Sequence, residues 1–437
     1  MIKMLKIKMI LFGLISIFTI KVGNAQTFDQ KYFETVLDSL TSNSFAGRGY
    51  VENGMTNAGN YLQAEFQKNG LKSFSNNYTQ AFNFPINVIK DAKLKINGKE
   101  LKYGIDFIVK PSSRSVSESK LAFYTLNTNE YVESFQSNDK TRHFIVKDNE
   151  LQKRKHIILP PLVTSVDSIQ KYYKQWANVY EKEDNQDRAI FRFTSDKLTS
   201  SLSQRQSTVS EFIISDKFYS KNMKINDFSV KTELNPSFSA NNIIGYIDGK
   251  NNDSVVVISA HYDHLGKVGQ TIFPGASDNA SGTAMMMTLM KYYSKHQPNY
   301  RTVFMAFAGE EAGILGADYY VNNPLFDLKQ IKFLVNLDIM GAGDQGIQVV
   351  NGKVFKKQFD QLVELNQTNN YLKEVKIRGE SCNSDHCPFY QKGVPSFFIY
   401  TLGGKGFYHD PNDTAANLDL SYSEKVYYLL RDFIGGL

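Results

Sequence analysis

The chain has 437 residues, a length typical of two or three domains, with 42% hydrophobic and 22% charged residues. These values are ordinary for a globular protein and exclude fibrous, collagen-like and wholly disordered classes. The formal net charge is +6, and it falls to +2 without the four lysines of the first 25 residues. A nearly neutral remainder gives no argument for nucleic acid or an anionic membrane as a partner.

The first 25 residues have the pattern of a secretory signal peptide. Lysines precede an apolar run at 9–20, and small residues end the segment before an expected cleavage after Ala25. The alternative is a membrane anchor, but the run is shorter than the roughly 20 residues that a spanning helix needs. We therefore expect an exported protein, periplasmic or extracellular, with no stable membrane anchor after cleavage.

Two helical patterns come next, at 33–40 and 58–66, with apolar residues at i, i+3 and i+4 in both, followed by i+7 in the first and i+8 in the second. From about residue 86 the pattern changes, and the alternation around Asn97-Gly98 is typical of a β-hairpin with a tight turn. The stretch up to about 235 is polar, with short apolar runs and no cluster of metal-ligand residue types. We predict a separate, mostly β module that acts as a lid, a substrate-selecting wall or a partner surface.

From about residue 236 apolar strands alternate with helical patterns. This order predicts an α/β fold, with a mixed, largely parallel twisted sheet and helices on both faces. The expected strands are 243–246, 255–260, 302–308, 331–337 and 396–401, and the expected helices are 280–295, 312–322, 353–369 and 421–433.

Acidic and histidine residues follow the ends of these strands or precede a helix. Because ligand sites of open α/β sheets lie beyond the carboxyl ends of the strands, we expect these side chains to converge. They are His261, Asp263, Asp278, Glu310, Glu311, Asp338 and His409.

Each signal has a plainer interpretation when taken alone. The His261-x-Asp263 pair is also compatible with a polar surface loop that ends in His264, and Asp278 with a helix N-cap. The Glu310-Glu311 pair could be exposed, but adjacent carboxylates after a buried strand repel each other unless a cation is present. Together, imidazole and carboxylate ligands suit zinc, and a bridging carboxylate suits a two-metal hydrolase. The sequence has no His-Glu-x-x-His, Gly-x-Ser-x-Gly or P-loop motif.

The two cysteines, Cys382 and Cys387, lie close together in the sequence. In an exported protein they could form a small-loop disulfide, and the alternative is two free or separately buried thiols. His386 next to Cys387 has the look of a catalytic thiol pair, but a structural use of the cysteine is the stronger interpretation.

Six ordered motifs resemble metallopeptidase family 28, which includes double-zinc aminopeptidases, glutamate carboxypeptidase and the glutaminyl cyclases. They are SAHYDHLG, PGASDNASGTA, FAGEEAGILGADYY, NLDIMG, SDHCPF and FYHDPNDT, all within 236–437. A looser resemblance covers 27–85. Together, the two resemblances imply a discontinuous catalytic domain, 26–85 and 236–437. Residues 86–235 would be an inserted β-rich domain, similar to the protease-associated lids of some family members.

The resemblance also implies roles for single residues. His261 and Asp338 would bind one zinc ion, Glu311 and His409 a second, and Asp278 both ions. Glu310 would be the general base, Tyr408 would help to stabilise the oxyanion, and Asp263 would support His261. Asp413 would support His409, and His386 matches no ligand. Ser277 stands where the family often has a second acid.

The expected activity is therefore that of an exported, zinc-dependent aminopeptidase with two Zn²⁺ ions and peptides as substrates. A carboxypeptidase or dipeptidase-type hydrolase and a glutaminyl cyclase remain alternatives on the same scaffold. A binding protein that has lost the metal site is a further alternative, but the full ligand set argues against it. The preferred N-terminal residue, the oligomeric state and the role of the insert do not follow from the sequence.

Overall fold

The computed structural model describes residues 28–74, 77–118, 123–129, 132, 156–162, 166–174 and 188–437. The expected signal peptide, 1–25, lies outside the described residues. None of the helices in the described ranges combines the length and the apolar character needed to span a membrane.

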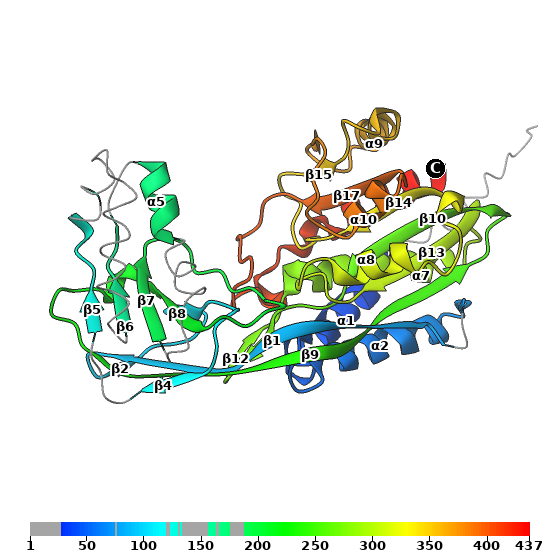
Figure 1. Cartoon of the computed structure of the whole chain (residues 1–437). Helices are drawn as coiled ribbons and strands as arrows, with labels where there is room; N and C mark the ends of the chain where they lie inside the picture. Colours follow the sequence, from blue (N-terminus) through cyan, green and yellow to red (C-terminus); the bar gives the residue numbers. More distant parts are fainter. Residues whose placement is uncertain are drawn as a thin grey trace, which may run out of the picture.

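A large mixed sheet forms the body of the molecule, in the order β16-β15-β17-β14-β10-β13-β9-β1-β2, with the short β4 paired to β9 (Figure 1). The pairs in the centre, from β17 through β14 and β10 to β13, are parallel, and the flanking pairs β13-β9, β9-β1 and β15-β17 are antiparallel. The strands of this sheet are β1 Thr79–Ile96, β2 Lys99–Glu100, β4 Val116–Glu118, β9 Ile225–Ile247, β10 Asn251–His261, β13 Tyr300–Phe307, β14 Ile331–Leu337, β15 Ile347–Val350, β16 Val375–Ile377 and β17 Ser396–Thr401.

Helices cover both faces of this sheet, as predicted. Successive side chains of a strand point to opposite faces, so Val256 and Ile258 of β10 join one core cluster, and Val255 and Val257 join another. Helices α1, α2, α7, α9 and α11 contribute to the first cluster, and α8 and α10 to the second. The helices are α1 Gln30–Thr41, α2 Gly54–Lys68, α7 Gly282–Tyr293, α8 Leu315–Asn322, α9 Lys356–Asn369, α10 His386–Gln391 and α11 Ser423–Gly436.

The expected helices are all present; α1 and α2 begin before the expected residue, and the four helices expected after residue 236 begin two or three residues after it. Helix α8 begins at Leu315 rather than at 312, because Gly313 and Ile314 have positive φ angles of 119° and 62°. Helix α7 is completely buried from Gly282 to Met290 and partly exposed only at Lys291 and Tyr292, which is typical of a helix packed between a sheet and other helices. At the N-terminus of α1, the Asp29 carboxylate accepts the main-chain N–H of Tyr32 and caps the helix.

The region between β1 and β9 forms a second sheet at the other end of the molecule (Figure 1). Its order is β3-β8-β7-β6-β5, parallel from β5 to β8, with α5 Asp167–Lys174 packed on one face. The strands are β3 Phe107–Val109, β5 Phe123–Thr125, β6 His156–Leu159, β7 Arg188–Thr194 and β8 Val209–Ser215. This sheet has its own core, and its β-rich character agrees with the predicted module; the domain boundaries stay a prediction.

Two long strands join the sheets. β1 and β9 pair antiparallel from Thr79↔Ile243 to Ile96↔Ile225, so both run out of the main sheet into the inserted region. The strand expected at 243–246 is therefore only the last part of a 23-residue strand. The expected hairpin around Asn97-Gly98 is present as the turn between β1 and β2.

Candidate metal centre

The predicted site residues meet at one edge of the main sheet. β10 ends at His261, and its parallel neighbours β13 and β14 end at Phe307 and Leu337, so the loops that follow all leave on the same side. This is the carboxyl edge at which α/β proteins bind ligands.

His261 is the centre of the first group of side chains. Its Nε2 lies 3.3 Å from Asp338 Oδ1, 3.4 Å from Asp278 Oδ1 and 4.0 Å from Glu310 Oε2. The His261 side chain is only 1% exposed, and that of Glu310 14%. This burial rules out the solvated-loop interpretation of the first histidine and the exposed-pair interpretation of Glu310.

His409 is the centre of the second group. Its Nε2 lies 2.9 Å from Glu311 Oε2 and 3.2 Å from Asp278 Oδ2. The other oxygen of Glu311, Oε1, is 2.5 Å from Nδ1 of His264, which is completely buried. Histidine and carboxylate atoms of this group lie close enough together to hold one metal ion, and those of His261, Glu310 and Asp338 form another such group.

Asp278 lies between the two groups. One carboxylate oxygen faces His261 and the other faces His409, whereas the N-cap position of α7 belongs to Ser281. The side chain therefore does not cap the helix. A carboxylate with one oxygen towards each histidine is arranged as a ligand shared between two cations would be.

Asp263 organises the turn that carries the two glutamates. Its Oδ1 accepts the main-chain N–H of Glu310 at 3.1 Å, and its Oδ2 accepts that of Glu311 at 3.3 Å and the hydroxyl of Tyr50 at 3.4 Å. Nδ1 of His261 is closer to the main-chain oxygen of Asp263, at 3.2 Å, than to its carboxylate, at 3.7 Å. Asp263 supports the glutamate turn at least as much as the histidine.

Arg48, between α1 and α2, bonds to several loops of the site and connects them. The guanidinium is fully buried and donates to main-chain oxygens of Leu40, Tyr262, Pro274, Gly275 and Asp278, at 2.6 to 3.4 Å. Burial lowers the pKa of Arg48 to about 10, although neighbouring carboxylates act in the opposite direction. The N-terminal segment thus holds the loop after β10 and the loop before α7 in place.

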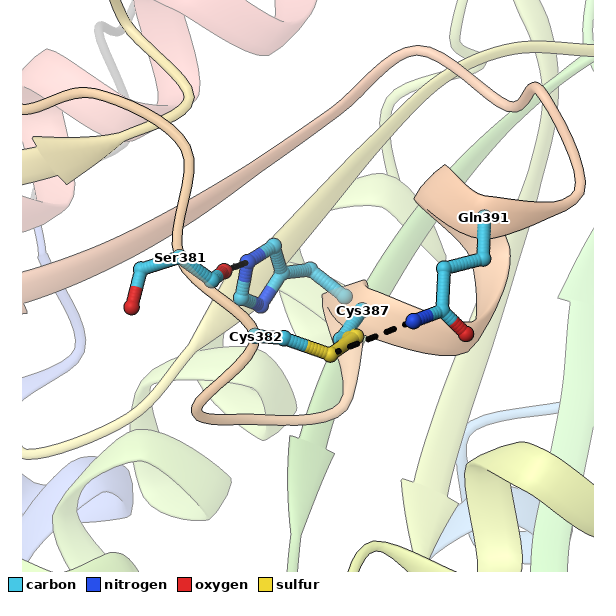
Figure 2. Close-up of a disulfide and its surroundings, with 5 residues drawn as sticks. Ser381, Cys382, Cys387 and Gln391 are labelled. Carbon is cyan, nitrogen blue, oxygen red and sulfur yellow. Dashed lines mark hydrogen bonds between the residues drawn. A yellow bond between two sulfur atoms is a disulfide. The ribbon is translucent and has the colours of Figure 1, made fainter.

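A disulfide loop supports Asp338. Its Oδ2 accepts the hydroxyl of Ser384 at 2.9 Å, and Ser384 lies between Cys382 and Cys387, which are bridged (Figure 2). The structure thus contains the disulfide, one of the two alternatives that the sequence left open. The thiol-pair interpretation of Cys387 is wrong, because a bridged sulfur is no nucleophile.

His386 is buried inside this loop and donates from Nε2 to the main-chain oxygen of Ser381 at 2.8 Å. Burial lowers the pKa of His386 to about 4, so the ring is neutral near pH 7. The neighbouring Asp385 is completely buried, and burial raises its pKa to about 8.

The electrostatics of the site fit bound cations. Burial, followed by the nearby charges of Asp385, Glu311 and Asp338, raises the pKa of Glu310 well above its usual value. Within the part of the chain that the structure describes, the buried basic groups beside these acids are Arg48 and the site histidines, and nearby carboxylates raise the pKa of His261 and His409 against the effect of burial. Crowded buried carboxylates are costly without compensating positive charge, so the donor set of the two groups suits divalent metal ions.

Tyr408 and Asp413 lie beside a cavity of about 90 Å³ that borders Asp278. The ring of Tyr408 stacks on that of His409 at 3.9 Å between centroids and remains 49% exposed. Asp413 does not contact His409 as the resemblance implied. Its carboxylate accepts the main-chain N–H groups of Ser277 and Asp278, because the chain folds back over that loop.

The sequence analysis missed four contributors to this site. His264 stood in the motif SAHYDHLG as part of a polar cluster, and its place directly after Asp263 was the available signal. Ser384 opens the motif SDHCPF, but a serine bonded to one carboxylate has no distinctive spacing, and neither has an arginine bonded to main-chain oxygens, as Arg48 is. Ser200 is the fourth, and its main-chain oxygen accepts from His409 Nδ1 at 2.9 Å.

Comparisons with known proteins agree with this geometry. Residues 242–434 match the sequence model of Peptidase family M28. Aminopeptidase YwaD of Bacillus subtilis (strain 168) is 29% identical over 194 residues, which is 41% of this chain and 41% of that protein. A probable leucine aminopeptidase of Trichophyton verrucosum (strain HKI 0517) is 28% identical over 233 residues, which is 50% of this chain and 59% of that protein. The chain thus matches about half of the length of these curated relatives.

One solved structure extends the likeness to nearly the whole chain. A zinc aminopeptidase from Bacillus subtilis superposes with a TM-score of 0.66 over 93% of this chain and 94% of its own, at 17% identity. A likeness at this identity establishes the fold. The predicted family resemblance and the predicted α/β fold are both confirmed.

Proposed function

Residues 242–434 belong to peptidase family M28, and from this premise we propose that the protein is an exported zinc-dependent aminopeptidase acting on peptides. The observation that carries the proposal is the position of Asp278, with one oxygen towards His261 and the other towards His409. Relatives named as aminopeptidases support the aminopeptidase assignment over the carboxypeptidase and cyclase alternatives. The N-terminal pattern of 1–25 supports export to the periplasm or the extracellular space.

Two zinc ions are proposed, one for each group of ligands. His261 and Asp338 would hold one ion, Glu311 and His409 the other, and Asp278 both. Zinc held in this way supplies Lewis acidity and lowers the pKa of a water molecule towards about 7.

The protein residues then have distinct tasks. Glu310 is the proposed general base: its raised pKa suits a group that takes a proton from water and returns it to the leaving amine. Asp263 keeps this carboxylate in position by accepting two main-chain N–H groups of the glutamate turn. Tyr408, half exposed beside the cavity that borders Asp278, is the proposed hydroxyl donor to the oxyanion.

The test is hydrolysis of aminoacyl nitroanilides, free and N-acetylated, by the purified mature protein. Each substrate is assayed as prepared, with a chelator, and after zinc is restored. We expect cleavage of the free-amine substrates alone, its loss with the chelator and its recovery with zinc. Equal cleavage of acetylated substrates would contradict an aminopeptidase, and chelator-resistant cleavage would contradict the metal mechanism. No cleavage of either by zinc-loaded protein would favour a carboxypeptidase, a cyclase or a binding protein.

A further inference from the structure

A loop of the inserted region reaches the metal centre. It is residues 197–204, hereafter the 197–204 segment, and it connects β7 to β8 of the second sheet. Its Leu202 packs against both the core of the main sheet and the core of the inserted sheet, so the segment lies where the two parts of the molecule meet.

The segment contacts His409 in both directions. The main-chain N–H of Ser200 donates to the main-chain oxygen of His409 at 3.4 Å, and Nδ1 of His409 faces the main-chain oxygen of Ser200 at 2.9 Å. A carbonyl can only accept, so Nδ1 must carry the proton. In the neutral ring, Nε2 then has the free lone pair and points towards Glu311 and Asp278, and this tautomer is the one that binds a metal through Nε2.

The backbone of His409 also needs external support. Its φ angle is 52°, in the left-handed region that is unfavourable for residues other than glycine. Such a conformation persists only where the surroundings hold it, and the bonds to Ser200 and the stacking of Tyr408 are the contacts that do so here.

Two side chains of the segment hold the loops on either side. Lys197 Nζ donates to the main-chain oxygen of Gly406 at 2.7 Å and to that of Tyr408 at 3.4 Å. Gln204 Nε2 donates to the main-chain oxygen of Ala312 at 2.8 Å, directly after the glutamate pair. The segment therefore attaches to the loop that carries Tyr408 and His409 and to the loop that carries Glu310 and Glu311.

We propose that the 197–204 segment is a positioning element of the active site, which orients His409 and fixes the two ligand loops relative to each other. The inserted region would then be a functional part of the metal centre and not only a cover over it. This inference rests on the metal centre proposed above. It assigns no catalytic residue, because Lys197, Ser200 and Gln204 act through the groups that they hold.

The experiment compares the full-length mature protein with the double variant Lys197→Ala/Gln204→Glu. Both side chains are exposed, so the fold should survive, and Gln204→Glu keeps the shape while removing the donor. Lys197→Arg keeps a cationic donor and serves as the conservative variant. Lys217→Ala is the matched control, because that lysine pairs with Asp106 inside the inserted region, at 2.9 Å.

Three quantities are measured: zinc affinity by competition with a chromogenic chelator, amide exchange of residues 402–409, and kcat and KM for a nitroanilide. For the double variant we expect about 10-fold weaker binding of one zinc ion, faster amide exchange in 402–409 and a lower kcat. The 10-fold loss of affinity corresponds to the loss of one or two hydrogen bonds. Lys197→Arg with Gln204 intact and Lys217→Ala should match the parent protein.

Unchanged zinc affinity in the double variant would overturn the proposal, even if amide exchange in 402–409 became faster. In that case the segment would restrain the 402–409 loop without orienting His409 for zinc. Unchanged exchange would overturn it as well. Neither the zinc affinity nor the amide exchange requires a substrate. If the parent protein bound zinc but hydrolysed no peptide, the proposed function would be wrong. The zinc affinity and the amide exchange of the variants would still test the positioning role of the segment.

Discussion

Replacement of Arg48 offers a direct test of how the N-terminal segment builds the site. All five N–H groups of its guanidinium face main-chain oxygens. At about 1.5 kcal/mol for each charge-assisted bond, they contribute roughly 7 kcal/mol. The pKa lowered from 12.5 to about 10 corresponds to a cost of about 3 kcal/mol for keeping the charge buried. The net contribution is therefore about 4 kcal/mol.

We expect Arg48→Met to lower the free energy of unfolding by about 4 kcal/mol, and Arg48→Lys by about 2 to 3, because an ammonium offers three donors. Urea unfolding of metal-free protein measures both. Arg301→Met is the control, since that partly exposed arginine pairs with Asp248 and should cost less than about 1 kcal/mol. A loss below 1 kcal/mol for Arg48→Met would refute the reasoning. The Met variant should also bind zinc more weakly, because two ligand loops lose their common support.

Three further predictions concern single residues. Glu310→Gln should lower kcat by about 10²- to 10⁴-fold with both zinc ions retained, as measured by elemental analysis; unchanged turnover would exclude the general-base role. His264→Ala should weaken zinc binding by about 10-fold, because Glu311 loses the donor to its Oε1, and His264→Gln should recover part of it. If Gln gave no recovery and Co²⁺ spectra showed a lost nitrogen ligand, His264 would itself be a ligand. Burial lowers the pKa of His386 from about 6.5 in the unfolded chain to about 4 in the folded protein. Below pH 6.5 the unfolded chain therefore binds a proton at this ring that the folded protein does not, so the free energy of unfolding is highest above pH 6.5 and declines as the pH falls. Metal-free parent protein should lose about 2 kcal/mol more than His386→Gln between pH 7 and pH 5 in urea unfolding, and equal losses would show that this ring is not the titrating group.

The sequence predicted those features that depend on a residue type or on the spacing of apolar residues. Apolar spacing predicted α1 and α2, continuous apolar runs predicted the central strands, and acids placed after those runs predicted the ligand groups. These features depend on neighbours in the chain, or on the general rule that parallel strands end together.

What the sequence did not reveal depends on main-chain partners. The contacts of Arg48 join residues up to 230 positions apart, and that of Ser200 with His409 spans 209 positions. A carbonyl oxygen is present at every position, so its use as an acceptor leaves no mark on the sequence. The full length of β9 was missed for a different reason, because its middle part, 231–239, has no buried residue and pairs with β1 without an apolar face to reveal it.

The long ribbon of β1 and β9 has a mechanical consequence. The two strands share one hydrogen-bond ladder from the main sheet to the inserted region, interrupted by register shifts between Phe84 and Ile86 and between Ile89 and Asp91 (Figure 1). A ladder of this kind resists free swivelling, unlike a flexible linker, and bends most easily where its register shifts. We therefore expect the ribbon to limit how far the inserted region can move from the main sheet, which would keep the 197–204 segment close to the ligand groups. A graft of this region onto another scaffold would need both strands cut in register, since a slip of one residue turns every side chain of the ribbon to the opposite face.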